Sequence, residues 1–270
     1  MDIITALILG IVQGITEWLP VSSSAHLVIV QHFLDIGDDN PVLFDAVVHL
    51  GTLLAVLLAT RKYVLDVFLS SVKAFRGNIT ENLKNDADAR AGWGAVIATI
   101  PIVIAGLVFQ NAVESAFSSL WVVAAMLPVT GLILFSVRGK HGKESSVSMK
   151  KAIIIGTAQV FALVPGISRS GTTIAAGIHT GMERGSATTF SFLMAILAIA
   201  GAGALQIYKA MHEPSSLDVT VLLTGFFSSF VVGYLAIRAL LRIVVTDKFH
   251  YFAYYCWALS AFLFAYLLHP

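Results

Sequence analysis

Charged residues are scarce in this sequence, and cysteine is nearly absent. Of the 270 residues, 12% are charged and 57% are hydrophobic, whereas a soluble domain carries about 25% charged residues. So little charge cannot cover a water-facing surface, and a net charge of +1 excludes the basic footprint of a nucleic-acid-binding protein. The single cysteine, Cys256, excludes internal disulfides and cysteine-based metal sites. The sequence therefore predicts an all-α polytopic membrane protein, built as one integral-membrane domain over residues 1–270.

Long apolar stretches define the expected spans. A helix that crosses a bilayer needs about 20 mostly apolar residues, and two stretches of sufficient length, 3–34 and 151–180, are interrupted near their middle by polar clusters at Pro20 and Pro165. A helix ends near such a proline, and irregular backbone at membrane depth is tolerated only inside protein or beside water. We expect these two stretches to form re-entrant helical hairpins. Six uninterrupted stretches are expected to be transmembrane helices: 42–60, 93–110, 119–137, 188–208, 219–241 and 249–268.

The distribution of Lys and Arg supports this topology, because cytoplasmic loops are enriched in both. If both hairpins are re-entrant, fifteen of the 17 basic residues lie on one side, whereas two crossing hairpins would divide them twelve against four. The re-entrant arrangement therefore predicts a plasma-membrane protein with a cytoplasmic loop at 61–92 and both termini outside the cytoplasm.

The two interrupted stretches resemble each other. The pattern Gly-x-x-Gln begins at Gly10 and again at Gly156, and each copy leads to a proline, a serine cluster and a spanning helix. The topology makes the two hairpins enter from opposite sides. Similar units with opposite entry form an inverted-topology repeat, in which broken helices meet near the bilayer midplane. We predict such a repeat over about 1–110 and 151–241.

Few ionisable residues are expected at lipid depth: Glu17, Asp45 and Arg169. Ionisable groups are costly there and usually functional. Gln13 and Glu17 are four residues apart, so they share a helix face. That face leads into a loop with three serines and His26. A purely structural alternative is that Glu17 pairs with Arg169 to hold the two hairpins together.

Arg169 stands at an expected helix start. Free N–H groups at a helix N-terminus bind anions, and an arginine fork binds phosphate through two hydrogen bonds. Two serine-lined tips that face each other would form a phosphate cradle, although Ser and Thr also serve as packing contacts in membrane helices. The residues predicted to bind the substrate are Gln13, Ser22, Ser24, Gly166, Ser168, Ser170, Gly171, Thr172 and Thr173.

Two histidines deserve separate consideration. His26 lies in the first polar break, where histidine can act as a base, an acid or a nucleophile. Asp45 and His49 are another pair four residues apart, near the outer end of a span. This second pair either anchors the span at the interface or supports the site from behind.

Three segments carry a resemblance to a known family. Residues 13–26 read QGITEWLPVSSSAH, residues 165–173 read PGISRSGTT, and residues 44–51 read FDAVVHLG. Together with the length and expected topology, they resemble the bacitracin-resistance family of undecaprenyl-diphosphatases over the whole chain. Gln13 departs from the family pattern, which often has Glu at this position, and Ala25 stands where Gly is common.

The resemblance implies a membrane phosphatase that converts a polyprenyl diphosphate lipid into the monophosphate carrier used in cell-wall synthesis. It also implies a divalent cation, Mg²⁺ or Ca²⁺. The matched catalytic positions are Glu17, Ser23, His26 and Arg169. Ser23 and His26 both remain candidates for the nucleophile, and Glu17 would orient His26 or help to hold the metal. Membrane lipids are expected partners, and a homodimer is compatible with the sequence.

A transporter or flippase for an anionic or lipid-phosphate substrate is the alternative function. Inverted repeats with broken helices are typical of secondary transporters. His26, close in sequence to Glu17 and the serines, favours chemistry instead, because binding a phosphate does not require a nucleophile and a base.

Overall fold

The computed structural model describes residues 1–36, 41–210 and 218–269. Within these residues the chain is helical, with no β-strand and a single isolated bridge between Glu144 and Met182. The helices are α1 (Ile3–Trp18), α2 (Ser23–Phe33), α3 (Pro41–Ala59), α4 (Arg61–Arg76), α5 (Ile79–Asn85), α6 (Ala87–Val108), α7 (Gln110–Phe117), α8 (Leu120–Phe135), α9 (Met149–Gln159), the 3₁₀ helix η1 (Val160–Leu163), α10 (Arg169–His179), α11 (Arg184–Ala210), α12 (Val219–Val244) and α13 (Tyr251–Leu268).

The predicted all-α polytopic membrane protein is confirmed. Helices α6, α11, α12 and α13 are each long and apolar enough to cross a membrane. The expected spans 42–60 and 119–137 correspond to α3 and α8, but these two helices qualify only together with sharply bent neighbours. Helix α3 meets α4 at 85°, and α7 meets α8 at 98°. The first bend lies where the charged pair Arg61-Lys62 ends the apolar stretch.

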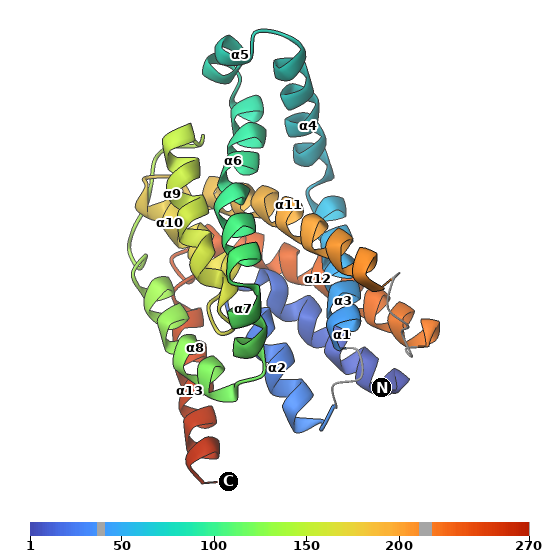
Figure 1. Ribbon diagram of the computed structural model, residues 1–270. Coiled ribbons are helices and arrows are strands. Elements are labelled where there is room, and N and C mark those ends of the chain that lie inside the picture. The colour runs from blue at the N-terminus through green and yellow to red at the C-terminus, as the bar shows by residue number, and fades with distance from the viewer. Residues whose placement is uncertain (37–40, 211–217, 270) are drawn as a thin grey trace.

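Both interrupted stretches are helix–break–helix hairpins (Figure 1). In each, the incoming helical segment ends two residues before the proline: α1 ends before Pro20, and η1 ends before Pro165. The outgoing helices α2 and α10 begin after serine N-caps, Ser22 and Ser168, whose hydroxyls accept backbone N–H groups of the first turn. The sequence places both breaks correctly, and the 3₁₀ turn in the second hairpin is an additional feature.

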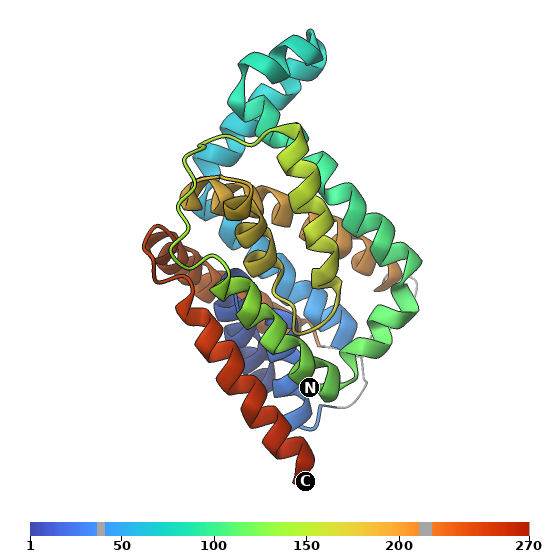
Figure 2. The same ribbon diagram turned by 90° about the vertical axis from the view of Figure 1, so that its left-hand side faces the viewer.

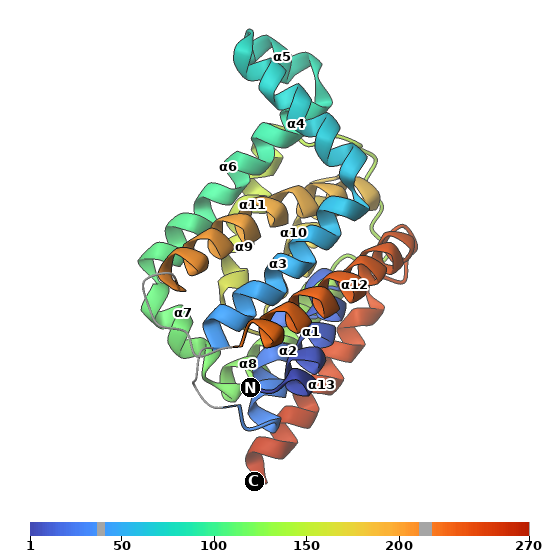
Figure 3. The same ribbon diagram turned by 90° about the vertical axis from the view of Figure 1, so that its right-hand side faces the viewer.

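Each hairpin packs its first helix against a helix from the other half of the chain. Helix α1 lies along α12, as Figure 3 shows, whereas α9 lies along α6. The shared Gly-x-x-Gln pattern explains these contacts. A Cβ atom on Gly10 would lie 2.8 Å from the Gly225 carbonyl oxygen of α12, and one on Gly156 would lie 2.6 Å from the Ala98 Cα atom of α6. Glycine therefore permits a close approach of the two helices at both positions.

The long axis of the molecule separates two ends. Both termini lie toward one end, and α4 and α5 form the other (Figures 1 and 2). Helices α3 and α11 pack against each other, and α8 packs against α13. The outgoing helices α2 and α10 both pack against α8, and α10 also packs against α11.

Candidate active site

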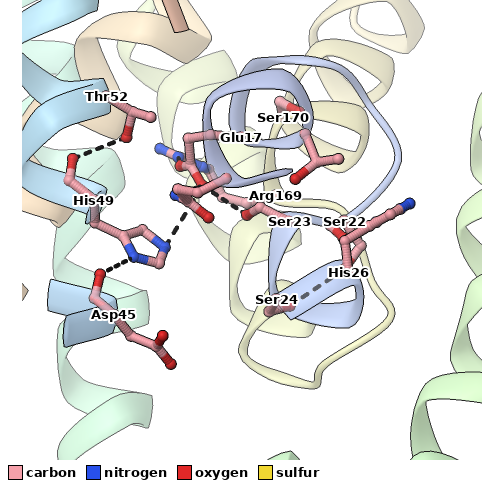
Figure 4. A network of polar contacts seen from close by, with 12 residues as sticks. Glu17, Ser22, Ser23, Ser24, His26, Asp45, His49, Thr52, Arg169 and Ser170 are labelled. Atoms are coloured by element: carbon pink, nitrogen blue, oxygen red, sulfur yellow. Dashed lines mark hydrogen bonds and ion pairs between the residues drawn. The ribbon is translucent and has the colours of Figure 1, made fainter. Parts of the chain in front are cut away.

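Glu17 is the centre of the polar network in the hairpin region (Figure 4). Glu17 is buried, with only 6% of its surface exposed. The Oε2 atom accepts hydrogen bonds from Gln13 Nε2 at 2.9 Å and from the Ser23 hydroxyl at 2.6 Å. The Oε1 atom forms an ion pair with Arg169 Nη2, and His49 Nε2 lies 3.6 Å from Oε2. One buried carboxylate thus joins side chains from α1, α2, α3 and α10.

Arg169 reaches Glu17 from the second hairpin. Its guanidinium also lies over the Trp18 ring, with 5.8 Å from Cζ to the ring centroid. The indole of Trp18 is fully buried and packs edge-on against Phe192, which fixes the surface beneath the arginine. The second guanidinium nitrogen, Nη1, is buried without a hydrogen-bond partner. Since a buried donor is rarely left unpaired, this atom is available for a ligand.

The two hairpin tips meet, as the sequence predicts. The Gly166 N–H donates to the Ser22 hydroxyl at 3.2 Å, and the Ser170 hydroxyl donates to the Leu19 carbonyl at 3.3 Å. Ser24 lies beside Ser22, with 3.2 Å between their hydroxyl oxygens. These contacts connect the serine clusters of both breaks directly.

Thr130 of α8 holds the tip of the second hairpin through two hydrogen bonds. Its hydroxyl donates to the Gly166 carbonyl at 2.7 Å and accepts the Ser168 N–H at 2.9 Å. Gly166 has φ of +104°, and a Cβ there would meet the Met126 Cβ at 2.6 Å. Only glycine fits this turn, because its φ is strained for other residues and the space is filled.

The remaining predicted residues of the second tip lie at the N-cap and in the first turns of α10. The Ser168 hydroxyl caps the helix by accepting the Gly171 N–H at 3.1 Å, so this N–H is no longer free for an anion. Thr173 shares a 2.6 Å hydrogen bond with Ser191 of α11. Thr172 has a buried hydroxyl without a partner. Of these residues, Thr172 retains unused hydrogen-bonding capacity, whereas Thr173 holds α10 against α11.

The two histidines occupy opposite positions relative to Glu17. In Figure 4, His49 points toward the carboxylate and His26 points away from it. His26 bonds through Nδ1 to the Ser22 carbonyl oxygen at 2.8 Å and through Nε2 to the Tyr255 hydroxyl at 2.7 Å. Within the described residues no hydrogen bond joins Glu17 to His26. The geometry therefore does not support the expectation that Glu17 orients His26.

Asp45 supports the site indirectly. Its carboxylate accepts the Gln31 amide at 3.0 Å, which ties α3 to α2, and its backbone carbonyl accepts His49 Nδ1 at 2.6 Å. Because a carbonyl oxygen can only accept, Nδ1 carries the proton, and Nε2 is the atom that faces Glu17. The predicted pair thus places one imidazole edge beside the central carboxylate.

The side chains around Glu17 do not fit a cation held by the protein alone. Within the described ranges no three His, Cys, Asp or Glu side chains are grouped as metal ligands. Both oxygens of Glu17 already accept donors, and the Arg169 guanidinium is an immediate neighbour. One turn earlier, the neutral Gln13 adds no second carboxylate.

Sequence reasoning missed three contributors to this site. Trp18 supports Arg169, Thr130 holds the second tip, and Tyr255 bonds to His26. Thr130 lies inside a helix that looks like an ordinary apolar span, and Trp18 is an apolar neighbour of Glu17 at the end of α1. Tyr255 belongs to an aromatic run in the last span, where interfacial anchoring is the usual explanation.

Comparison with known proteins places this geometry in a family context. The model of the family described as "Bacitracin resistance protein BacA" matches residues 6–262. The chain is 41% identical to a protein named undecaprenyl-diphosphatase from Methanobrevibacter smithii, over 98% of this chain and 97% of that protein. A protein of the same name from Arthrobacter sp. is 42% identical, over 93% of this chain and 88% of its own length. Another, from Rubrobacter xylanophilus, is 39% identical over 99% of both chains.

Proposed function

The chain belongs to the family of the bacitracin resistance protein BacA, and we propose that it hydrolyses undecaprenyl diphosphate to undecaprenyl phosphate and inorganic phosphate. It is thus a membrane phosphatase that regenerates the monophosphate carrier for cell-wall polymer synthesis. The observation that carries the chemistry is the 2.6 Å hydrogen bond from the Ser23 hydroxyl to the Glu17 carboxylate. A hydroxyl bonded to a buried carboxylate is an activated nucleophile.

Ser23 is the nucleophile in the mechanism that this contact supports. Its Oγ attacks the terminal phosphorus while its proton passes to Glu17 Oε2. The bond from that phosphorus to the bridging oxygen breaks, and the lipid monophosphate leaves with the bonding electrons. Water then attacks the phosphorus of the phosphoserine, the bond from that phosphorus to Ser23 Oγ breaks, and Oγ takes its proton back from Glu17 Oε2. Inorganic phosphate leaves with the oxygen and both protons of the water. His26 is less suited to attack, because both of its ring nitrogens already have partners.

Arg169 stabilises the charge that develops on the transferred phosphoryl group. Its unpaired Nη1 donor supplies a hydrogen bond to the phosphoryl oxygens, since the Gly166, Ser168 and Gly171 N–H groups of this tip already have protein acceptors. Donors that are already in place for a transition state lower the barrier, because they need no reorganisation during the reaction. Arg169 therefore binds phosphate, in addition to neutralising Glu17.

The structure offers an apolar surface for the lipid chain of the substrate. A groove between α1 and α12 lies on the side of α1 that carries Leu7 and Ile11. Its lining residues are Leu7, Ile11, Thr220, Leu223, Thr224, Phe227, Ser228, Val231 and Val232. The position of both termini at the end opposite α4 supports the predicted orientation, with the 61–92 segment in the cytoplasm.

Phosphate release from undecaprenyl diphosphate by the purified protein tests the function. The Ser23→Ala variant is expected to lose activity by about 10³-fold or more, because no nucleophile remains. Ser115→Ala is the matched control, since that hydroxyl donates to the Ala112 carbonyl of its own exposed helix. Assays with and without Mg²⁺ or Ca²⁺ test the cation dependence that the family resemblance implies.

Two outcomes would contradict these assignments separately. Undiminished release by Ser23→Ala would exclude Ser23 as the nucleophile but leave the activity standing. Absence of release by folded, lipid-bound wild-type protein would exclude the phosphatase. Lipid-phosphate transport in liposomes would then be measured, because the broken helices and the Arg169 anion site also suit a transporter.

A further inference from the structure

Tyr255 on α13 lies beside His26 on α2, although 229 residues separate them. The phenol oxygen is 2.7 Å from His26 Nε2. The two rings are nearly parallel, with an interplanar angle of 8° and 5.7 Å between centroids. This arrangement fixes both the position and the plane of the imidazole.

The hydrogen-bond partners determine which ring nitrogen carries the proton. The Ser22 carbonyl can only accept, so His26 Nδ1 must donate to it. In the neutral imidazole, Nε2 is then an acceptor, and the Tyr255 hydroxyl donates to it. Neither nitrogen hydrogen-bonds to Ser23, whose hydroxyl donates to Glu17 instead.

The carbonyl that accepts the hydrogen bond from His26 Nδ1 belongs to a strained turn. Ser22 has φ of +70°, a conformation that residues other than glycine adopt at a cost. The same residue caps α2 and accepts the Gly166 N–H of the second tip through its hydroxyl. Ser23 follows directly and begins α2. The Ser22 carbonyl also accepts the His26 backbone N–H, at 3.3 Å, so the imidazole adds a second hydrogen bond to the carbonyl that directly precedes Ser23.

We propose that Tyr255 is a positioning residue of this phosphatase, acting through His26 to hold the Ser22 turn and so to keep the Ser23 hydroxyl on Glu17. The proposal rests on the function proposed above. Its physical content is a chain of two hydrogen bonds, from the Tyr255 hydroxyl to His26 Nε2 and from His26 Nδ1 to the Ser22 carbonyl. In this chain His26 contributes a fixed donor and does not remove the proton of Ser23.

Isosteric substitutions of His26 separate the two roles. Asparagine places its amide N–H near the position of Nδ1, whereas glutamine places it near Nε2. If His26 holds the Ser22 carbonyl, His26→Asn should keep at least tenfold more activity than His26→Gln. If His26 were the base for Ser23, both variants would be equally inactive, since neither amide takes up a proton. Equal inactivity of the two folded variants would overturn the proposal.

The Tyr255→Phe variant tests the hydrogen bond from the Tyr255 hydroxyl to His26 Nε2, because it keeps the ring and removes the hydroxyl. We expect kcat to fall about tenfold with KM unchanged, since a misplaced nucleophile slows the chemical step. In the His26→Asn background the same substitution should have no further effect. Tyr254→Phe is the matched control: it lies next in the chain and packs against Trp257 and Phe135. An unchanged kcat in Tyr255→Phe would contradict the proposal.

A spectroscopic measurement does not depend on activity. In ¹⁵N-histidine-labelled protein, with His26 assigned by its loss in His26→Asn, Nδ1 should be protonated and Nε2 a hydrogen-bonded acceptor. Tyr255→Phe should shift the Nε2 resonance toward that of a free acceptor, and Tyr254→Phe should not. A protonated Nε2 with a bare Nδ1 would refute the hydrogen-bond chain even in an active enzyme. The expected spectrum from an inactive wild-type protein would refute the function alone.

Discussion

The two hairpins begin with the same pattern and end with opposite chemistry. Gln13 and Gln159 occupy equivalent places, and both are fully buried. Four residues later the first hairpin has Glu17, whereas the second has the apolar Leu163. After the break, the first hairpin begins its outgoing helix with Ser23 and the second begins its own with Arg169. The first hairpin thus supplies the carboxylate and the proposed nucleophile, and the second supplies the arginine guanidinium.

This difference shows why neither hairpin can form the site alone. A lone carboxylate or guanidinium inside a membrane protein is costly, and pairing them across the two tips reduces that cost. The same carboxylate contacts the proposed nucleophile, Ser23, of one hairpin and the proposed phosphate-binding group, Arg169, of the other. A glycine permits close helix packing in both hairpins, whereas the polar groups near the two breaks differ.

Breaking the ion pair should have the largest effect. Arg169→Ala leaves Glu17 buried without its cation, so we expect the free energy of unfolding to drop by about 3–5 kcal/mol. Phosphate release should fall by about 10³-fold, since a phosphate-binding donor is lost as well. Thermal or denaturant unfolding in detergent and the release assay measure the two effects.

A double variant separates the structural role of this pair from its functional role. Glu17→Gln with Arg169→Gln removes both charges, so most of the lost stability should return while activity stays absent. Recovery of activity together with stability would show that the pair only holds the hairpins together.

A smaller effect should distinguish the two glycine contacts. In Gly156→Ala the new methyl group meets the backbone of Ala98, which cannot rotate away, and we expect a loss of about 1–3 kcal/mol. In Gly10→Ala the nearest atom is the Ser228 hydroxyl, the movable end of a side chain. One backbone atom, the Gly225 carbonyl oxygen, also lies within 3 Å, whereas all three nearest atoms at Gly156 are backbone. The unfolding free energy of Gly10→Ala should therefore be closer to wild type than that of Gly156→Ala.

The Ser228→Ala substitution provides the control for this comparison. Combined with Gly10→Ala, it removes the clashing hydroxyl and should recover part of the loss. It should give no recovery when combined with Gly156→Ala, because Ser228 belongs to α12 and the second glycine packs on α6. Equal losses from the two glycine substitutions would mean that the α1–α12 contact is as rigid as the α9–α6 contact.

Much of this architecture could be predicted because it follows from local rules. The prolines fix where α1 and η1 end, and the serines that follow cap the next helices. The cost of placing Glu17 and Arg169 at lipid depth predicts that they meet. The bends at α3–α4 and α7–α8 were less predictable, since hydropathy measures apolar length and not direction.

The orientation of individual side chains could not be predicted. Sequence proximity places His26 near Glu17, but α2 turns the imidazole outward toward Tyr255, which comes from the far end of the chain. His49, which the sequence left between anchoring and support, is instead the histidine beside the carboxylate. Spacing along one helix determines a face, whereas tertiary packing decides which group lies opposite it.

Arg184 anchors the segment that follows the second hairpin. Arg184, at the start of α11, is buried and donates to the backbone carbonyls of Val137, Lys140 and Thr246. It also pairs with the exposed carboxylate of Asp247 at 2.8 Å. The segments after α8 and α12 are thereby tied to the helix that follows the second hairpin.

The smallest expected effect concerns Asp247. The Gly139 N–H, and then the Arg184 guanidinium, hold the pKa of Asp247 below its ordinary value of 3.8. A carboxyl whose pKa is lowered by folding stabilises the fold above the pKa of the unfolded chain, and this contribution disappears as the pH falls through the folded value. Asp247→Asn should therefore unfold at a slightly lower temperature than wild type near pH 7, and the difference should shrink below about pH 3.8 and vanish below the lowered pKa of the folded protein. Glu114→Gln, an exposed carboxylate that accepts from Gln110 of its own helix, is the control. A difference that persists unchanged at low pH would show that Asp247 acts through its neutral hydrogen bond to Gly139, and that the charge of Arg184 adds nothing to the anchor of the second hairpin.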